Sequence, residues 1–111
     1  MITDEDAEKA ANYLRDTAED AAEARANRMY VVEFRKTMKA KAMQQAEMLN
    51  EKLPIAAQER EAYADENYVK YLDVVKEAIR IDAHHEFMRE AAQAKISAWQ
   101  TMHKTLRGTG V

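Results

Sequence analysis

The sequence has no cysteine, one proline and two glycines, and both glycines lie within its last four residues. The absence of cysteine excludes disulfides and thiolate chemistry. Turns between strands depend on Gly, Pro and Asn-Gly pairs, which are missing over most of the chain. Because good helix formers such as Ala, Glu, Lys, Gln and Met dominate instead, we expect an all-α fold in a single helical domain, residues 1–111.

Long apolar runs are also missing. No run approaches the roughly 18 residues that a membrane span needs. The first ten residues, "MITDEDAEKA", are acidic and lack the basic-then-apolar order of a signal peptide. We therefore expect a cytoplasmic protein with no membrane partner.

The positions of the few capping and breaking residues predict three helices. Thr3 precedes three acids, which suit the start of a helix, and the next breaker is Pro54. This predicts a helix over about residues 4–51, a turn at "NEKLP", and a short connecting helix with Pro54 in its first position. Asp65 is placed to cap a last helix over about residues 66–106, before Gly108.

Apolar residues on both long helices recur with a period close to 3.5, which predicts that the helices pack as an antiparallel hairpin. A hairpin folded about residue 58 places residue i opposite residue 116 − i. This register pairs Ala94 and Ala98 with Ala22 and Ala18, so that alanine meets alanine. On the last helix, the expected seam runs through Tyr68, Leu72, Val75 and Ile79 and continues from Phe87 after an offset near Ala83.

Two long helices and a short one cannot enclose a core, and several large apolar side chains lie off the expected seam. Tyr30, Phe34 and Trp99 are the aromatic ones that we expect at an interface. They favour a homodimer that forms a four-helix bundle. A monomer with an exposed apolar stripe is the alternative.

Charge is unevenly distributed along this acidic chain. Residues 25–41 carry six bases and one acid, whereas residues 1–24 carry eight acids and two bases. On a helix, five of the six bases fall within a sector about 100° wide. They are Arg25, Arg28, Arg35, Lys36 and Lys39. Such a face predicts contact with nucleic-acid phosphates or with a protein partner.

A structural role for two of these arginines is the competing interpretation. Arg28 and Arg35 occupy seam positions, and the hairpin register brings them close to Glu86 and Asp82. Arginine suits partly buried pairing with carboxylates, and such pairs often fix register more than they add stability. Their exposure therefore decides between the two interpretations.

Catalytic and metal-binding patterns are weak. His84 and His85 are adjacent, so on a helix they point about 100° apart and do not chelate one ion in the i, i+4 manner, and His103 lies far along the same helix. The chain has no glycine-rich phosphate loop, and an alanine-rich hairpin offers no evident pocket to shift a carboxylate pKa. We expect no enzyme activity, no metal, no cofactor and no small-molecule substrate.

Three strings, "YVVEFRKTMKAKAM", "AAQEREAYADENYVKYL" and "AKISAWQT", occur in this order. Together they resemble a group of small uncharacterised phage and prophage proteins, over about residues 10–103. The resemblance implies a setting among recombination and replication genes, and it brings no catalytic residues.

The sequence thus predicts a non-enzymatic phage accessory protein that binds DNA or a DNA-processing protein through the basic helix face. The alternatives are a protein-only adaptor or inhibitor of a host factor, with acidic ends that mimic nucleic acid or an apolar docking stripe, and a structural assembly component.

Overall fold

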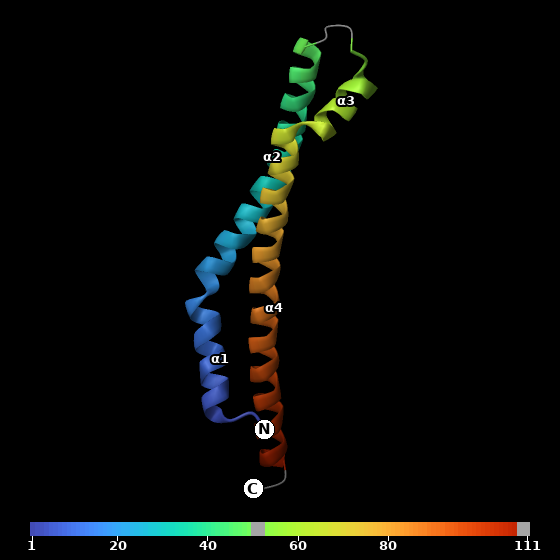
Figure 1. Cartoon of the computed structure of the whole chain (residues 1–111). Coiled ribbons are helices and arrows are strands. Elements are labelled where there is room, and N and C mark those ends of the chain that lie inside the picture. The colour runs from blue at the N-terminus through green and yellow to red at the C-terminus, as the bar shows by residue number, and fades with distance from the viewer. Residues whose placement is uncertain (50–52, 109–111) are drawn as a thin grey trace. The chain divides into compact units, whose positions relative to one another are not determined.

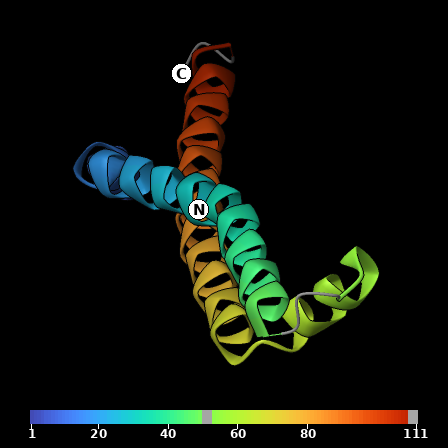
Figure 2. The ribbon, with the colours of Figure 1, turned by 90° about the horizontal axis from the view of Figure 1, so that it is seen from above.

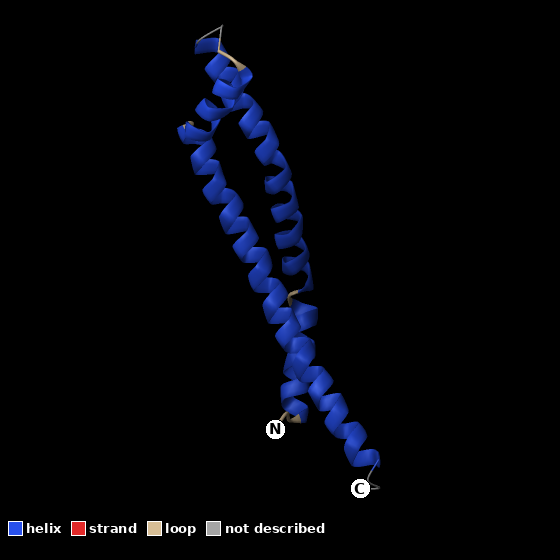
Figure 3. Ribbon diagram, turned by 90° about the vertical axis from the view of Figure 1, so that its right-hand side faces the viewer, coloured by secondary structure: helices blue, strands red, loops and turns tan. Residues whose placement is uncertain are grey.

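The computed structural model describes residues 1–49 and 53–108, which form helices joined by short loops and turns (Figure 3). The helices are α1 (Asp4–Asp16), α2 (Ala18–Leu49), α3 (Ile55–Ala64) and α4 (Glu66–Gly108). The predicted all-α class is confirmed. Within the described ranges, no helix combines the length and the apolar character that crossing a bilayer requires.

Two helix starts are capped by the residues that the sequence indicates. The Thr3 hydroxyl accepts from the backbone N–H of Asp6 at 3.0 Å, and the Thr3 backbone N–H donates to the Asp6 carboxylate at 3.0 Å, which forms a capping box. Asp65 accepts from the backbone N–H of Tyr68 at 2.9 Å and so caps α4. Pro54 immediately precedes α3 instead of occupying its first position. The other turn residues, 50–52, lie outside the described part of the chain.

The expectation of one helix over residues 4–51 is wrong at Thr17, where α1 ends and α2 begins one residue later. The Thr17 hydroxyl donates to the carbonyl of Tyr13 at 2.6 Å, a back-bond that bends helices. Arg89 of α4 donates to the carbonyl of Leu14 at 3.0 Å. In a continuous helix the Leu14 carbonyl would accept from the backbone N–H four residues later, that of Ala18. A side chain that enters the helical ladder in this way is an established cause of a kink.

The chain divides into two compact units. One, which we call the terminal unit, comprises Met1–Glu23 and Asp82–Val111, and the other, the middle unit, comprises Ala24–Ile81. In the terminal unit, α1 runs antiparallel to the last part of α4 (Figure 1), because Asp4 bonds to Trp99 whereas Leu14 bonds to Arg89. In the middle unit, α2 and the first part of α4 are antiparallel, and α3 lies beside the last turns of α2 (Figure 2).

The core of the middle unit is small. One cluster joins Val31 to Val75 and Ala78, and a second is made by Ala42, Ala62 and Tyr68. The hydroxyl of Tyr71 donates to the carbonyl of Val31 at 2.6 Å. Among the described residues, no large side chain is fully buried. The middle unit therefore encloses little apolar surface by itself.

The predicted alanine register of the terminal unit is wrong. Ala18, Ala22, Ala94 and Ala98 are all exposed. The buried alanines are Ala7, Ala10 and Ala92. Leu14, which the prediction placed opposite Met102, bonds instead to Arg89. Alanines recur every three or four residues on both helices, so many registers match them equally well, and the polar bonds of Arg89 and Asp4 select one.

The buried side of α4 also differs from the expected seam. Leu72, Ile79 and Phe87 are exposed, and the predicted offset near Ala83 is wrong. One series of buried or half-buried residues runs along α4 at spacings of three and four without interruption, and the half-buried Ala83 and Met102 lie beside it. The series is Tyr68, Tyr71, Val75, Ala78, Asp82, His85, Arg89, Ala92, Ile96, Trp99 and His103. The prediction placed Asp82 on the seam but missed His85, Arg89 and His103, because charged and imidazole side chains do not show in an apolar pattern.

Candidate functional site

The five cations predicted as a binding face differ in their surroundings. Arg25, Arg35 and Lys36 are exposed on α2, whereas Arg28 is half-buried with a buried Nε. Lys36 lies 3.1 Å from the carboxylate of Glu33, in a pair that is exposed to solvent. An exposed pair of this kind adds little stability and opens readily to another anion.

Lys39 is held by α3. Its Nζ donates to the hydroxyl of Tyr63 at 2.9 Å and lies 4.7 Å from the centre of the Tyr63 ring. The carboxylate of Glu59 is 3.8 Å away. The hydrogen bond to Tyr63 is the main cause that raises the pKa of Lys39 above 10.5. Lys39 therefore fastens α3 to α2.

The predicted pairing of Arg28 and Arg35 with Glu86 and Asp82 stays a prediction. The two arginines belong to the middle unit, and the two acids belong to the terminal unit. Asp82 is buried, with 5% of its surface exposed, and Glu86 is exposed. Arg28 thus has the burial that the structural interpretation expects, and Arg35 does not.

Two of the predicted interface aromatics form a ladder on the middle unit. Tyr30 stacks on Phe34 with ring centres 5.8 Å apart, and Phe34 meets Tyr71 edge-on at 6.0 Å. Tyr30 is 66% exposed. Burial raises the pKa of Tyr71 above its ordinary value.

An open groove of about 380 Å³ lies in the same unit. Its apolar lining is Val74, Ala78 and Ile81 of α4, and Asn27, Asp73 and Glu77 supply the polar lining. Val74 and Ile81 are both exposed. With the aromatic ladder, these side chains make an apolar surface that we call the Tyr30 face (Tyr30, Phe34, Tyr71, Val74 and Ile81).

Trp99, the third predicted interface residue, lies in the terminal unit and is half-buried. Its indole N–H donates to a carboxylate oxygen of Asp4 at 2.7 Å, and Nε2 of His103 is 3.1 Å from the same oxygen. The Trp99 and His103 rings are 4.3 Å apart. The bond from Trp99 and then that from His103 hold the pKa of Asp4 below 3.8.

Arg89 is a polar anchor that the sequence did not reveal. Its Nη1 donates to the Leu14 carbonyl and, at 3.1 Å, to the hydroxyl of Thr17. The guanidinium lies at the C-terminal end of α1, where a helix carries partial negative charge. Arg89 and Asp4 therefore hold the two ends of α1 on α4.

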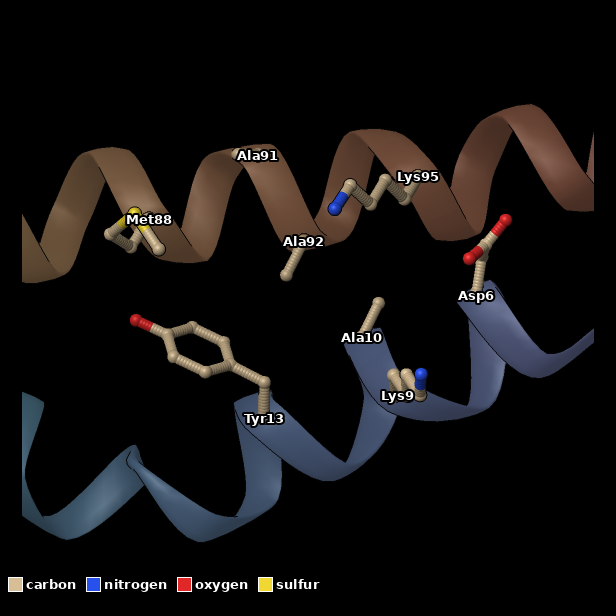
Figure 4. Close-up of a pocket in the computed structure, with 8 residues that line it drawn as sticks. All are labelled: Asp6, Lys9, Ala10, Tyr13, Met88, Ala91, Ala92 and Lys95. Atoms are coloured by element: carbon tan, nitrogen blue, oxygen red, sulfur yellow. The ribbon is translucent and has the colours of Figure 1, made fainter. Parts of the chain in front are cut away.

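Between these two anchors, a groove of about 250 Å³ separates α1 from α4 (Figure 4). Ala10 and Ala92 face each other across it, Tyr13 and Met88 lie at one end, and Lys95 lies toward the other. At the centre of the groove, the apolar contact of α1 is thus made by small side chains.

The histidines do not gather into a metal site within the described ranges, where no group of three or more His, Asp or Glu side chains is placed to hold an ion. The rings of His84 and His85 are 6.1 Å apart. Nδ1 of His85 is buried without a hydrogen-bond partner in this part of the chain.

Acid is expected to weaken the hold of Asp4 on α4. Because the folded-state pKa of Asp4 is lowered, its contribution to stability is present above its ordinary value of 3.8 and is lost as the pH falls through the lower folded value. We expect Asp4→Asn to be less stable than the wild type at about pH 5, with a difference that shrinks below pH 3.8. Urea unfolding at several pH values, followed by Trp99 fluorescence, measures this. If the stability difference between Asp4→Asn and the wild type is the same in acid as at about pH 5, the Asp4 charge does not stabilise the fold as described.

The comparisons with known proteins add no relative: no family model, no curated protein and no solved structure matches this chain.

Proposed function

We propose that this chain is a non-enzymatic accessory protein that acts by binding other macromolecules, and that it forms a homodimer through the Tyr30 face. The setting that we propose is the phage recombination and replication context implied by the sequence resemblance. The observation that carries the proposal is the exposure of large apolar side chains beside a core that is too small to cover them.

The argument for a dimer is that one pair of helices leaves apolar surface exposed to solvent. Each helix must bury its apolar stripe against another element, and contiguous apolar surface on a soluble protein marks an interaction site. On the Tyr30 face, two elements offer such surface side by side, because Phe34 of α2 contacts Tyr71 of α4. A second copy offers a surface of the same length and chemistry, and the product is a four-helix arrangement.

The test compares two neighbouring, similarly exposed residues. Tyr30 is on the Tyr30 face, and Met29, which is 61% exposed, points about 100° away from it around α2. Sedimentation equilibrium should show a dimer for the wild type and for Met29→Glu, and a monomer for Tyr30→Glu. A wild-type chain that remains monomeric at about 100 μM, where even weak micromolar association is populated, contradicts the dimer.

Nucleic-acid binding by α2 is the second candidate, because Arg25, Arg35 and Lys36 are exposed. Cations along one helix bind phosphates with little regard to sequence, and the affinity falls with salt. Gel shifts with single- and double-stranded DNA at about 50 mM salt, compared with higher salt, test this. The Arg35→Ala/Lys36→Ala variant should weaken binding, whereas Lys70→Ala/Lys76→Ala, which removes two exposed cations from α4, should not. Absence of any shift at low salt discards this candidate.

A further inference from the structure

One face of α4 in the terminal unit carries two aromatic rings between two cations, at intervals of four residues. Side chains four apart lie one above the other on a helix, about 6 Å apart along its axis. We call these four residues the Trp99 ridge: Lys95, Trp99, His103 and Arg107. Residues 95–111 contain three bases and no acid. The ridge is therefore a basic surface with two rings at its centre.

The side chains of α1 that meet this ridge are acidic. Asp4 accepts from both central rings, Trp99 and His103. Lys95 is close enough to Asp6 to help lower the pKa of that carboxyl, after the larger effect of its bonds to Thr3. Residues 4–16 carry five acids and two bases. α1 thus places anions where the ridge presents N–H donors.

α1 is also attached to α4 by few buried apolar side chains. Within the helix only Ala7 and Ala10 are buried, and alanine contributes little apolar area. The helix is separate from α2 at Thr17. Few buried apolar contacts and a break at one end are the properties of an element that opens locally while the rest stays folded.

We propose that the Trp99 ridge binds single-stranded nucleic acid and that α1 covers the ridge as an intramolecular competitor. Opening at Thr17 releases the Asp4 carboxylate from Trp99 and His103. Phosphates then pair with Lys95 and Arg107, and bases stack on the rings, which is how proteins bind single strands without sequence preference. This surface is different from the α2 cations and from the Tyr30 face.

A nucleic acid accounts for the ridge better than an acidic polypeptide does. Both supply anions, but only a nucleic acid also supplies flat bases for the two central rings, and stacking of a base on an aromatic side chain contributes about 1–3 kcal/mol. Along the ridge the order is cation, ring, ring, cation, so the two central rings offer a surface for stacking and each end offers a contact for a phosphate. Duplex DNA keeps its bases stacked inside and offers the ridge phosphates alone.

The experiment uses the full chain and an oligothymidylate of about 20 nucleotides, which spans more than one binding-site length. Asp4→Asn removes the competing carboxylate, and Asp16→Asn makes the same charge change at the other end of α1, where Asp16 contacts Arg15 instead of the ridge. We expect Asp4→Asn to bind at least tenfold more tightly than the wild type and Asp16→Asn, with quenching of Trp99, the only tryptophan. Adding Lys95→Ala and Arg107→Ala to Asp4→Asn should reverse the gain and lower the salt slope by about 0.7 per lost phosphate contact.

The outcomes separate the alternatives. Circular dichroism of each variant confirms that the helices are retained. Equal binding by Asp4→Asn and Asp16→Asn overturns the role of α1 as a cover. Binding without a change in Trp99 emission, or binding that survives the loss of Lys95 and Arg107, overturns the ridge as the site. Polyglutamate that quenches Trp99 as well as the oligothymidylate does would identify an acidic polypeptide as the ligand and overturn the nucleic-acid assignment.

Discussion

Tyr68→Ala is expected to lower the free energy of unfolding by about 3–4 kcal/mol, as large-to-small changes at buried rings do. Tyr68 is 5% exposed and packs with Ala42 and Ala62, the last of which has no exposed surface. Its ring also meets Tyr63 edge-on at 6.0 Å. Removing the ring opens a cavity where α2, α3 and α4 meet. Urea unfolding followed by far-ultraviolet circular dichroism measures the loss.

The matched control for Tyr68 is its neighbour. Val69 is on the same turn of α4 but is 46% exposed, so Val69→Ala should change stability by no more than about 0.5 kcal/mol. If Tyr68→Ala lowers the free energy of unfolding no more than Val69→Ala does, the cluster of Ala42, Ala62 and Tyr68 does not stabilise the middle unit as described.

Arg89→Ala is expected to lower the free energy of unfolding by about 2–3 kcal/mol. The substitution removes two hydrogen bonds from one charged nitrogen and leaves the half-buried Leu14 carbonyl without this donor. Because the site is half-buried, water replaces part of the loss, and the two bonds together contribute about as much as one charged hydrogen bond, about 1.5–3 kcal/mol. Loss of the guanidinium packing adds to the cost. The same unfolding measurement applies, and hydrogen exchange should show faster exchange in α1 than in the wild type.

Arg80 provides the comparison for Arg89. It is an exposed arginine on the same helix, paired with Glu77 three residues earlier. Exposed pairs of this kind contribute little, so Arg80→Ala should cost less than about 0.5 kcal/mol. Similar losses for the two variants would mean that the bonds of Arg89 to α1 do not hold that helix.

The helix class and the two capped starts were predictable because they depend on local sequence. Thr3 with Asp6, and Asp65 with Tyr68, are pairs only three residues apart. The break at Thr17 was not predictable in this way. Threonine is tolerated inside helices, and the donor that occupies the Leu14 carbonyl comes from residue 89.

The candidate site residues can also be separated into those that local sequence identifies and those that depend on distant contacts. Charge counting identified Arg25, Arg35 and Lys36, which are exposed, but the burial of Arg28 and the contacts of Lys39 depend on packing against distant segments. Tyr30 and Phe34 were identified as apolar groups off the seam. The Trp99 ridge was not predicted, although its i, i+4 spacing is visible in the sequence, because Trp99 was considered as an interface residue by itself and not together with the cations of the same helix.

The polar side chains within the seam of α4 have a consequence for alignment. If α1 slid along α4 by seven residues, Ala10 would leave Ala92 and lie opposite His85 or Trp99, depending on the direction of the slide. Arg89 would then lose the Leu14 carbonyl, and Asp4 would leave the Trp99 indole. The two bonds meet α1 at Asp4 and Leu14, which are about 15 Å apart at ~1.5 Å per residue, so a slide of α1 in either direction breaks both of them together. These two bonds therefore fix the alignment of α1 on α4.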